Sequence, residues 1–349
     1  MTRGATMARS DHKDRRAMRP GRAGAAHTQA RDAYKDVPIL QTPTWNNDIA
    51  AYFFLGGISS GAFVLGTLLE ADGTERRGLA RTARIVSFAA MLPCPVFLID
   101  DLGKPSRFHH MLRIFKPSSP MNLGSWALTC HGLFATLTAA RQLAAADKLP
   151  LGGDLLRAIP ERALAVGGFP TALTLGGYTG VLLGTTSVPV WSTSPLLGAL
   201  FMASALNTGV AATVAAAILT GNDDPGDHAA LGPFTIALGC SEIALLAGYL
   251  ATSGGAVRSL VHGREGILLA GALVGSVVAV ALDGAAMRTP THSRRLNLVG
   301  AIAALVGGAC LRWGIVRAGH VSAADREQTL DATKPSPKAP GWGPANRRV

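Results

Sequence analysis

Residues 163–222, "ALAVGGFPTALTLGGYTGVLLGTTSVPVWSTSPLLGALFMASALNTGVAATVAAAILTGN", contain no Asp, Glu, Lys or Arg in sixty consecutive positions. A helix needs about 20 apolar residues to cross a hydrocarbon core about 30 Å thick. The stretch therefore has room for two membrane-spanning helices, with a connection at residues 188–195. Two adjacent uncharged spans are typical of a polytopic membrane protein.

The rest of the sequence follows the same pattern. Hydrophobic residues make up 48% of the 349 positions and charged residues only 16%. The 41 glycines favour close helix packing, and Pro93 and Pro95 predict a kink inside one span. We expect an all-α polytopic membrane protein with eight transmembrane helices in a tight bundle, at residues 49–70, 82–101, 122–144, 163–187, 196–220, 229–254, 265–286 and 295–318.

The net charge of +11 lies largely in the two ends of the sequence. Residues 1–48 and 319–349 together contribute six of these charges. Because no basic helix interleaved with aromatic residues occurs elsewhere, nucleic acid is not a predicted partner. We predict a disordered basic tail at 1–44, an eight-helix membrane domain at 45–320 and a disordered tail at 321–349.

An even number of spans puts both termini on one side of the membrane, here called the N face, together with the connections 102–121, 188–195 and 255–264. An aromatic belt at the membrane interface would account for Trp45 and Trp191, but not for paired aspartates beside a basic cluster. A ligand with an aromatic head and two hydrogen-bonding oxygens, such as a quinone, needs a site that combines aromatic residues with charged and hydrogen-bonding ones. The polar and aromatic residues at this depth are Asn47, Asp48, Tyr52, Asp100, Asp101, Lys104, Arg107, His110, Trp126, Tyr178 and Thr179.

Ionisable residues inside the spans are the second group of candidates. Glu242 and Arg312 predict either a structural ion pair between the sixth and eighth helices or, with Asp283, a proton relay. His131 is the one histidine well inside a predicted span, so we expect a hydrogen-bonded core residue and no bis-histidine haem. The sequence has four cysteines and no CxxC motif, and we predict no metal in this protein.

Four motifs resemble the NrfD/PsrC family, the membrane subunits of polysulfide reductase, across roughly residues 40–320. They are "W…YFFLGG…G", "DLGKPSRF…L…FKPSSPMNLGSW", "GYTGVLL…VPVW" and "LRWGIVRAG". The resemblance implies a haem-free subunit of the cell (cytoplasmic) membrane that exchanges electrons with menaquinone or ubiquinone. It also implies two kinds of partner, a ferredoxin-like iron–sulfur subunit with [4Fe-4S] clusters and a molybdopterin-type catalytic subunit.

The motif "GYTG" extends the resemblance to the residues of the predicted quinone site. Tyr178 is similar to a tyrosine that contacts the quinone in this family, and Tyr52 is similar to the polar ring residue near the start of the first helix, with Asn47 or Asp48 beside it. Relatives can have histidine where this sequence has Tyr52.

The resulting hypothesis is a quinone-reactive membrane subunit. Tyr178, Asp101 and Tyr52 would bind the headgroup and exchange protons with it. Trp126 would form a wall of the pocket, while Lys104 and Arg107 would hold the partner or pair with the aspartates. The alternatives are a proton or solute transporter that uses Glu242, Arg312 and Asp283, and a passive membrane anchor. The count of basic residues in the loops leans toward an N face on the outer side.

Overall fold

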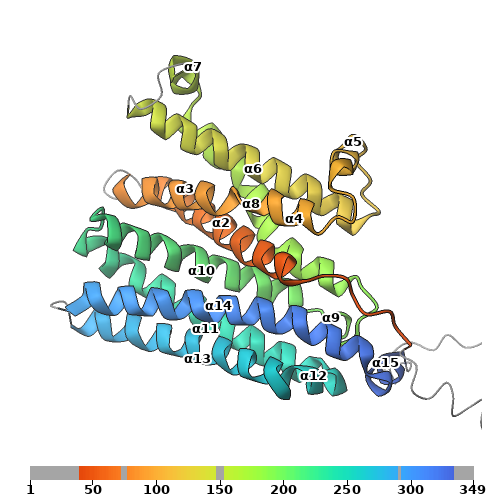
Figure 1. Cartoon of the computed structure of the whole chain (residues 1–349). Coiled ribbons are helices and arrows are strands. Elements are labelled where there is room, and N and C mark those ends of the chain that lie inside the picture. Colours follow the sequence, from red (N-terminus) through yellow and green to blue (C-terminus); the bar gives the residue numbers. More distant parts are fainter. Residues whose placement is uncertain (1–38, 72–76, 147–152, 290–291, 334–349) are drawn as a thin grey trace, which may run out of the picture. The chain divides into compact units, whose positions relative to one another are not determined.

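Long helices follow the hydropathy pattern along the whole membrane domain (Figure 1). The structure is a computed structural model that describes residues 39–71, 77–146, 153–289 and 292–333. No strand occurs in those ranges, and the all-α class is confirmed. The long helices are α2 (Asn47–Ala71), α3 (Arg77–Met91) continued by α4 (Cys94–Asp100), α6 (Pro120–Ala145), α8 (Glu161–Gly184), α10 (Leu197–Thr220), α11 (Pro225–Thr252), α13 (Gly263–Arg288) and α14 (Ser293–Ala324).

Six of these segments, within the described ranges, are long and apolar enough to cross a membrane. They are α2, α3 with α4, α10, α11, α13 and α14. The helices α6 and α8 are present at the predicted positions. Their mean hydropathy is lower than that of the six segments, because glycine, threonine, serine and aromatic residues with a polar group occupy much of their length. A multi-pass membrane protein is therefore supported, and the number of eight spans stays a prediction.

The second predicted span is broken at Pro93, as its sequence suggested. The carbonyl of Pro93 accepts the N–H groups of Val96 and Phe97, so a new helix begins directly after the break. A proline has no N–H to donate and its ring displaces the preceding turn, which is why α3 and α4 are separate helices.

Short helices cover one end of the bundle. The N-face connections hold η1 (Pro105–Arg107), α5 (His110–Arg113), α9 (Pro189–Ser192), η2 (Gly254–Val257) and α12 (Arg258–Val261). At the same end, the ring of Trp45 stacks on that of Trp191 at 5.4 Å, and the Trp191 Nε1–H donates to the carbonyl of Ile315 at 2.7 Å. The connections after α4, α8 and α11 therefore gather beside the start of α2, in agreement with the sorting of loops by helix count.

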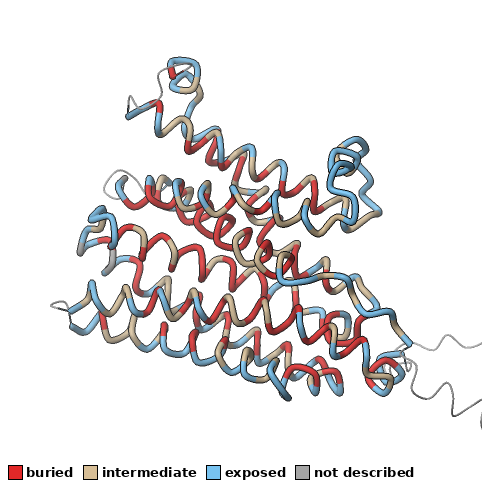
Figure 2. Tube along the Cα trace, in the orientation of Figure 1, coloured by how far each residue is buried: buried red, intermediate tan, exposed pale blue. Residues whose placement is uncertain are grey.

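The core lies along α2 and α10, which hold more buried residues than any other described helix (Figure 2). In the most apolar stretch of each helix, 83% of α2 and 72% of α10 is buried, compared with 22% of α13. Gly61 and Gly209 allow the close approach, since a Cβ on either would meet the backbone of the other helix. The helices α11 and α13 present much of their surface outward, as lipid-facing helices do.

The C-terminal end differs from the predicted tail. Helix α14 continues to Ala324 and is followed by α15 (Arg326–Thr333), in which Gln328 and Thr329 are buried. The Ser322 hydroxyl donates to Gln328 Oε1 at 2.9 Å, so this turn is tied to α14. Residues 1–38 of the predicted N-terminal tail and 334–349 of the C-terminal tail lie outside the described residues.

Candidate functional site

A small cavity of about 40 Å³ lies at the N-face end of α2, α4, α6 and α8. Tyr52, Asp101 and Tyr178, three residues predicted for one site, all line it. Each comes from a different part of the sequence, and they meet because alternate helix ends share a face in an up-and-down bundle. The remaining lining is mostly apolar and aromatic and consists of Trp45, Ile49, Phe53, Leu98, Met111, Met121, Gly124, Ser125 and Leu182.

Tyr178 is held against the start of α6. Its hydroxyl donates to the carbonyl of Pro120, and its ring lies directly over Gly124. A Cβ at position 124 would occupy the place of the Tyr178 ring carbons. Glycine at this position is therefore required for the tyrosine to reach the cavity wall.

Tyr52 and Asp101 offer the two polar groups that are not engaged elsewhere. Tyr52 is 2% exposed, and in the described part of the chain its hydroxyl has no hydrogen-bond partner. Asp101 follows the last residue of α4 as its C-cap and is half-buried. Its partial burial, together with the negative charges of Asp48 and Asp100, raises the pKa of the Asp101 carboxyl above the ordinary value. A carboxyl with a raised pKa is suited to exchange protons nearer to neutral pH.

The other predicted headgroup contacts lie around this cavity and do not line it. Asn47 is exposed at the start of α2, and Asp48 is half-buried one residue further on. Thr179 is buried next to Tyr178. Trp126 does not line the cavity and packs edge-on against Phe115 at 5.9 Å. Its buried Nε1–H has no hydrogen-bond partner among the described residues.

The loop between α4 and α6 is fixed by one asparagine. The Asn122 Nδ2 donates to the carbonyls of Met111 at 2.7 Å and Ile114 at 3.0 Å, while its Oδ1 accepts the N–H of Lys116 at 2.7 Å. The sequence placed Asn122 at the start of the third span but did not indicate this role. Since Met111 also lines the cavity, Asn122 couples the loop to the site.

The outer side of that loop is basic and partly apolar. Lys104 and Arg107 are exposed and form no ion pair within 4 Å in the residues that the structure describes, so the predicted pairing with Asp100 and Asp101 does not occur. We call this region the basic loop surface. Its exposed residues are Lys104, Arg107, Phe108, His109, His110, Arg113, Ile114, Phe115 and Lys116.

An apolar groove of about 320 Å³ adjoins the cavity between α3, α4 and α6. It shares Leu98, Met111 and Ser125 with the cavity, so the two spaces lie next to each other. From Ser125 it runs along α6 as far as Thr136. Leu92 at its edge is 58% exposed, as expected for a position that faces lipid.

Among the described residues, Glu242 and Arg312 form no ion pair within 4 Å with each other. Arg312 is 1% exposed and donates to Ser204 Oγ and to the carbonyl of Phe201 at 3.2 Å. Glu242 instead accepts from Asn207 Nδ2 at 2.6 Å and from Ser276 Oγ at 3.3 Å. The predicted Glu242–Arg312 ion pair is therefore wrong, and the sequence missed Asn207 because a neutral amide leaves no mark in a charge pattern.

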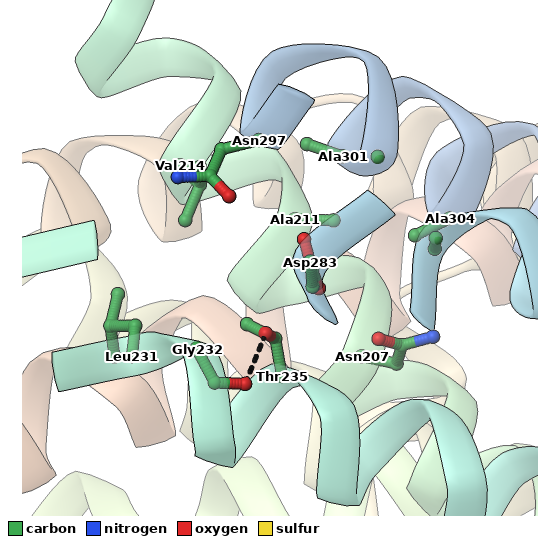
Figure 3. Close-up of a pocket in the computed structure, with 12 residues that line it drawn as sticks. Asn207, Ala211, Val214, Leu231, Gly232, Thr235, Asp283, Asn297, Ala301 and Ala304 are labelled. Carbon is green, nitrogen blue, oxygen red and sulfur yellow. Dashed lines mark hydrogen bonds between the residues drawn. The ribbon is translucent and has the colours of Figure 1, made fainter. Parts of the chain in front are cut away.

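Asp283 lines a separate small cavity among α10, α11, α13 and α14 (Figure 3). Asn207 and Thr235 also line it, and the Thr235 hydroxyl donates to the carbonyl of Gly232 at 3.0 Å. None of the residues around this cavity belongs to the N-face site.

His131 lies deep in the other half of the bundle. It is 0% exposed, and its Nε2 is 2.9 Å from Ser59 Oγ, which agrees with a hydrogen-bonded core residue. Near the opposite face, Glu70 accepts two hydrogen bonds from Arg84, at 3.0 and 2.8 Å. Among the described residues no group of three or more His, Cys, Asp or Glu is placed to hold a metal ion.

Trp191 differs from the interfacial position that the sequence favoured. It is 0% exposed and buried between the helix ends at the N face, where its ring edge fills the space above Gly319. Its role is to close the bundle and not to lie at the lipid headgroups.

Comparison with known proteins agrees with the sequence motifs. Residues 38–324 match the family described as "Polysulphide reductase, NrfD". The protein is 25% identical over 323 residues to a protein NrfD homolog of Haemophilus influenzae, covering 83% of this sequence and 99% of that protein. It is 27% identical over 315 residues to protein NrfD of Escherichia coli, covering 82% and 98%. It is 28% identical over 190 residues to one of the chains of polysulfide reductase from Wolinella succinogenes, covering 51% and 59%.

Proposed function

The chain belongs to the NrfD family of polysulphide reductase membrane proteins, and we propose that it is the quinone-reactive membrane subunit of a multi-subunit oxidoreductase. The observation that carries the proposal is that Tyr52, Asp101 and Tyr178 line one cavity, which lies beside an apolar groove. A ligand with a polar ring held against these three side chains and a long apolar tail in the groove would contact both. Menaquinone and ubiquinone have this form.

The three polar residues suit a quinone headgroup. The free hydroxyl of Tyr52 can donate to one ring oxygen, and the Tyr178 hydroxyl oxygen, whose hydrogen is directed at Pro120, can accept from a quinol. Asp101 can accept one proton when a quinol is oxidised and return it when a quinone is reduced. Oxidation of one quinol releases two electrons and two protons. Asp101 would take one proton, the second would leave to water at the N face, and the two electrons would pass to the partner.

The groove supports a membrane-soluble substrate. Its lining is apolar apart from Ser125, Thr129 and Thr136, and it lies between helices that face lipid. An isoprenoid tail could enter from the bilayer beside α4 and α6 and bring the headgroup to the cavity. A small water-soluble substrate would not require this path.

Electrons must pass to a partner, which we place at the basic loop surface. We propose that this partner is a ferredoxin-like subunit with [4Fe-4S] clusters, bound to a molybdopterin-type catalytic subunit. The unpaired Lys104 and Arg107 favour an acidic partner surface, and Phe108 and Phe115, 42% and 57% exposed, offer apolar contacts beside them. Because Asn122 ties this loop to Met111, the docked partner would lie close to the cavity. The complex would then be anchored in the cytoplasmic membrane by this protein.

Two other functions are less well supported. A passive anchor has no need for a free buried tyrosine hydroxyl beside a carboxyl with a raised pKa. A transporter that uses Glu242, Arg312 and Asp283 would leave the N-face cavity without a role. Substrate-linked flux through the isolated protein in liposomes would favour the transporter.

The test uses Tyr178→Phe in the assembled complex, with Tyr249→Phe as the matched control. Both tyrosine hydroxyls donate to a backbone carbonyl, of Pro120 and of Val190, but Tyr249 is not in the cavity. We expect Tyr178→Phe alone to lower quinol-linked turnover, while turnover of the soluble substrate with an artificial electron donor stays the same in both. Mass spectrometry of the purified complex should detect bound quinone. Unchanged quinol-linked turnover in Tyr178→Phe, or the absence of bound quinone, would contradict the proposal.

A further inference from the structure

Trp45 lies between the N-face cavity and a second space at the same face. This second space, here called the outer hollow, has a volume of about 330 Å³ and is lined from within residues 40–45 and 186–191. Gln41, Thr44 and Ser187 in its lining are exposed, so the hollow is open to water. Of the residues that line the two spaces, Trp45 is common to both.

The N-face cavity therefore has lipid on one side and water on the other. The apolar groove shares Leu98, Met111 and Ser125 with it, whereas the outer hollow shares Trp45. The cavity is small, about 40 Å³, compared with the hollow beside it. Removal of the Trp45 side chain would join the two spaces and let water into the cavity.

Helix α2 does not itself hold Trp45 in this position. The side chain of Asn46 accepts the N–H of Asp48 at 2.8 Å, which makes Asn46 the N-cap of α2. Trp45 thus precedes the N-cap, and its carbonyl oxygen takes no part in the hydrogen bonds of the helix. Its position depends on contacts from other helices.

His320 on α14 supplies one of these contacts. Its Nε2 lies 2.6 Å from the carbonyl oxygen of Trp45. Because a carbonyl oxygen can only accept, the Nε2 carries the hydrogen and donates it. The two residues are 275 positions apart in the sequence, so no local pattern could have predicted the bond.

Trp191 on α9 supplies the other contact and is itself fixed by α14, which lies beside α9 (Figure 1). The ring of Trp45 stacks on that of Trp191 at 5.4 Å and 25°. The Trp191 Nε1–H donates to the carbonyl of Ile315 at 2.7 Å, and its ring fills the space above Gly319. A tryptophan of an interfacial belt lies at the lipid headgroups, whereas Trp45 covers a ring that is 0% exposed.

We propose that Trp45 closes the N-face cavity toward the water of the outer hollow, and that His320 is the positioning residue that keeps it closed. The use of this closure rests on the proposed function, since a headgroup makes stronger hydrogen bonds where water is excluded. Protons would then reach water at the half-buried Asp101 and not through the hollow. The closure itself can be measured without a quinone.

The test measures how fast a cysteine in the cavity reacts in open membrane fragments that contain the full-length protein. Ile49→Cys is the reporter, because Ile49 is 4% exposed and lines the cavity but neither the groove nor the outer hollow. A charged methanethiosulfonate reagent reacts with this cysteine only where water reaches it. Peptide mass spectrometry reads position 49 separately from the four native cysteines.

The variants are combined with this reporter. His320→Leu removes the donor, and His320→Gln restores an N–H group. We expect His320→Leu to raise the labelling rate about fivefold, the factor that corresponds to one lost hydrogen bond, and His320→Gln to return it close to that of the reporter alone. His262→Leu is the matched control and should change nothing, because His262 Nδ1 also bonds to a backbone carbonyl at the N face, that of Arg258 at 3.0 Å, but lines neither space.

Trp45→Ala should give the largest increase in labelling, and Trp45→Leu is the second variant if Trp45→Ala does not accumulate. Equal labelling with and without the indole would overturn the closure, and an unchanged rate in His320→Leu would overturn the role of His320. In the assembled complex, His320→Leu should also raise KM for the quinol, with turnover from an artificial donor unchanged. Faster labelling with unaltered quinol kinetics would contradict the quinone site and still support the closure, so the two proposals fail in different ways.

Discussion

The fit of Tyr178 over Gly124 gives the strongest single perturbation of the N-face cavity. In Gly124→Ala, the new methyl group would fall on the Tyr178 ring, so the ring must move and its hydroxyl must leave the Pro120 carbonyl. Overpacking of this kind costs about 1–3 kcal/mol, and the lost hydrogen bond about 1 kcal/mol. The higher helix propensity of alanine than of glycine offsets about 1 kcal/mol of this cost.

We therefore expect Gly124→Ala to lower the free energy of unfolding by about 2 kcal/mol. Because the Tyr178 hydroxyl then leaves the cavity wall, kcat/KM for the quinol should fall about fivefold, as for the loss of one hydrogen bond worth about 1 kcal/mol. Gly177→Ala is the control, because the nearest atom to its Cβ would be the flexible end of Met202 at 3.4 Å, an ordinary contact distance, and position 177 does not line the cavity. The assay compares quinol-linked turnover of the complex with turnover from an artificial donor. Equal quinol kinetics in the two alanine variants would refute the placement of the headgroup against Tyr178.

Three further outcomes test other parts of the site. Asp101→Asn should abolish the rise in quinol oxidation rate with pH, since the carboxylate accepts the proton only above its pKa, which burial and neighbouring carboxylates raise; a pH–rate profile checks this. Thr129→Trp should fill the groove and raise KM for a long-tailed quinol but not for a short-tailed analogue, while Leu133→Trp on the 57% exposed face of α6 changes neither. Charge reversal at Lys104 and Arg107 should weaken co-purification of the iron–sulfur partner, most strongly at low salt.

The helices could be predicted from the sequence because lipid imposes a simple pattern. The spans at 196–220 and 265–286 agree with α10 and α13 to within two residues, since charged residues are excluded from a hydrocarbon core. The α3–α4 break was also predictable, as proline has one physical effect in a helix. Helix α15 was missed because its residues are polar and only their packing against α14 makes them a helix.

The candidate site could be predicted in part for the same reason. Helix order alone puts Tyr52, Asp101 and Tyr178 at one depth, and all three line one cavity. The depth of a residue in the membrane does not show in which direction its side chain points around the helix axis. Trp126 shares that depth but turns toward Phe115. Asn207 was not predicted, because nothing in a hydropathy profile distinguishes an asparagine that serves a buried glutamate from one that does not.

Arg312 relates the two polar sites within the bundle. A Cβ on Gly57 would lie 3.1 Å from an Arg312 terminal nitrogen, so the guanidinium packs directly against α2, five residues from Tyr52. On its other side, Ser204 and Asn207 lead to Glu242. A positive charge therefore lies between the N-face cavity and the buried carboxylate of Glu242. Because charges interact strongly in the low-dielectric interior of the bundle, a change of charge at the cavity would act on Glu242 through the field at Arg312.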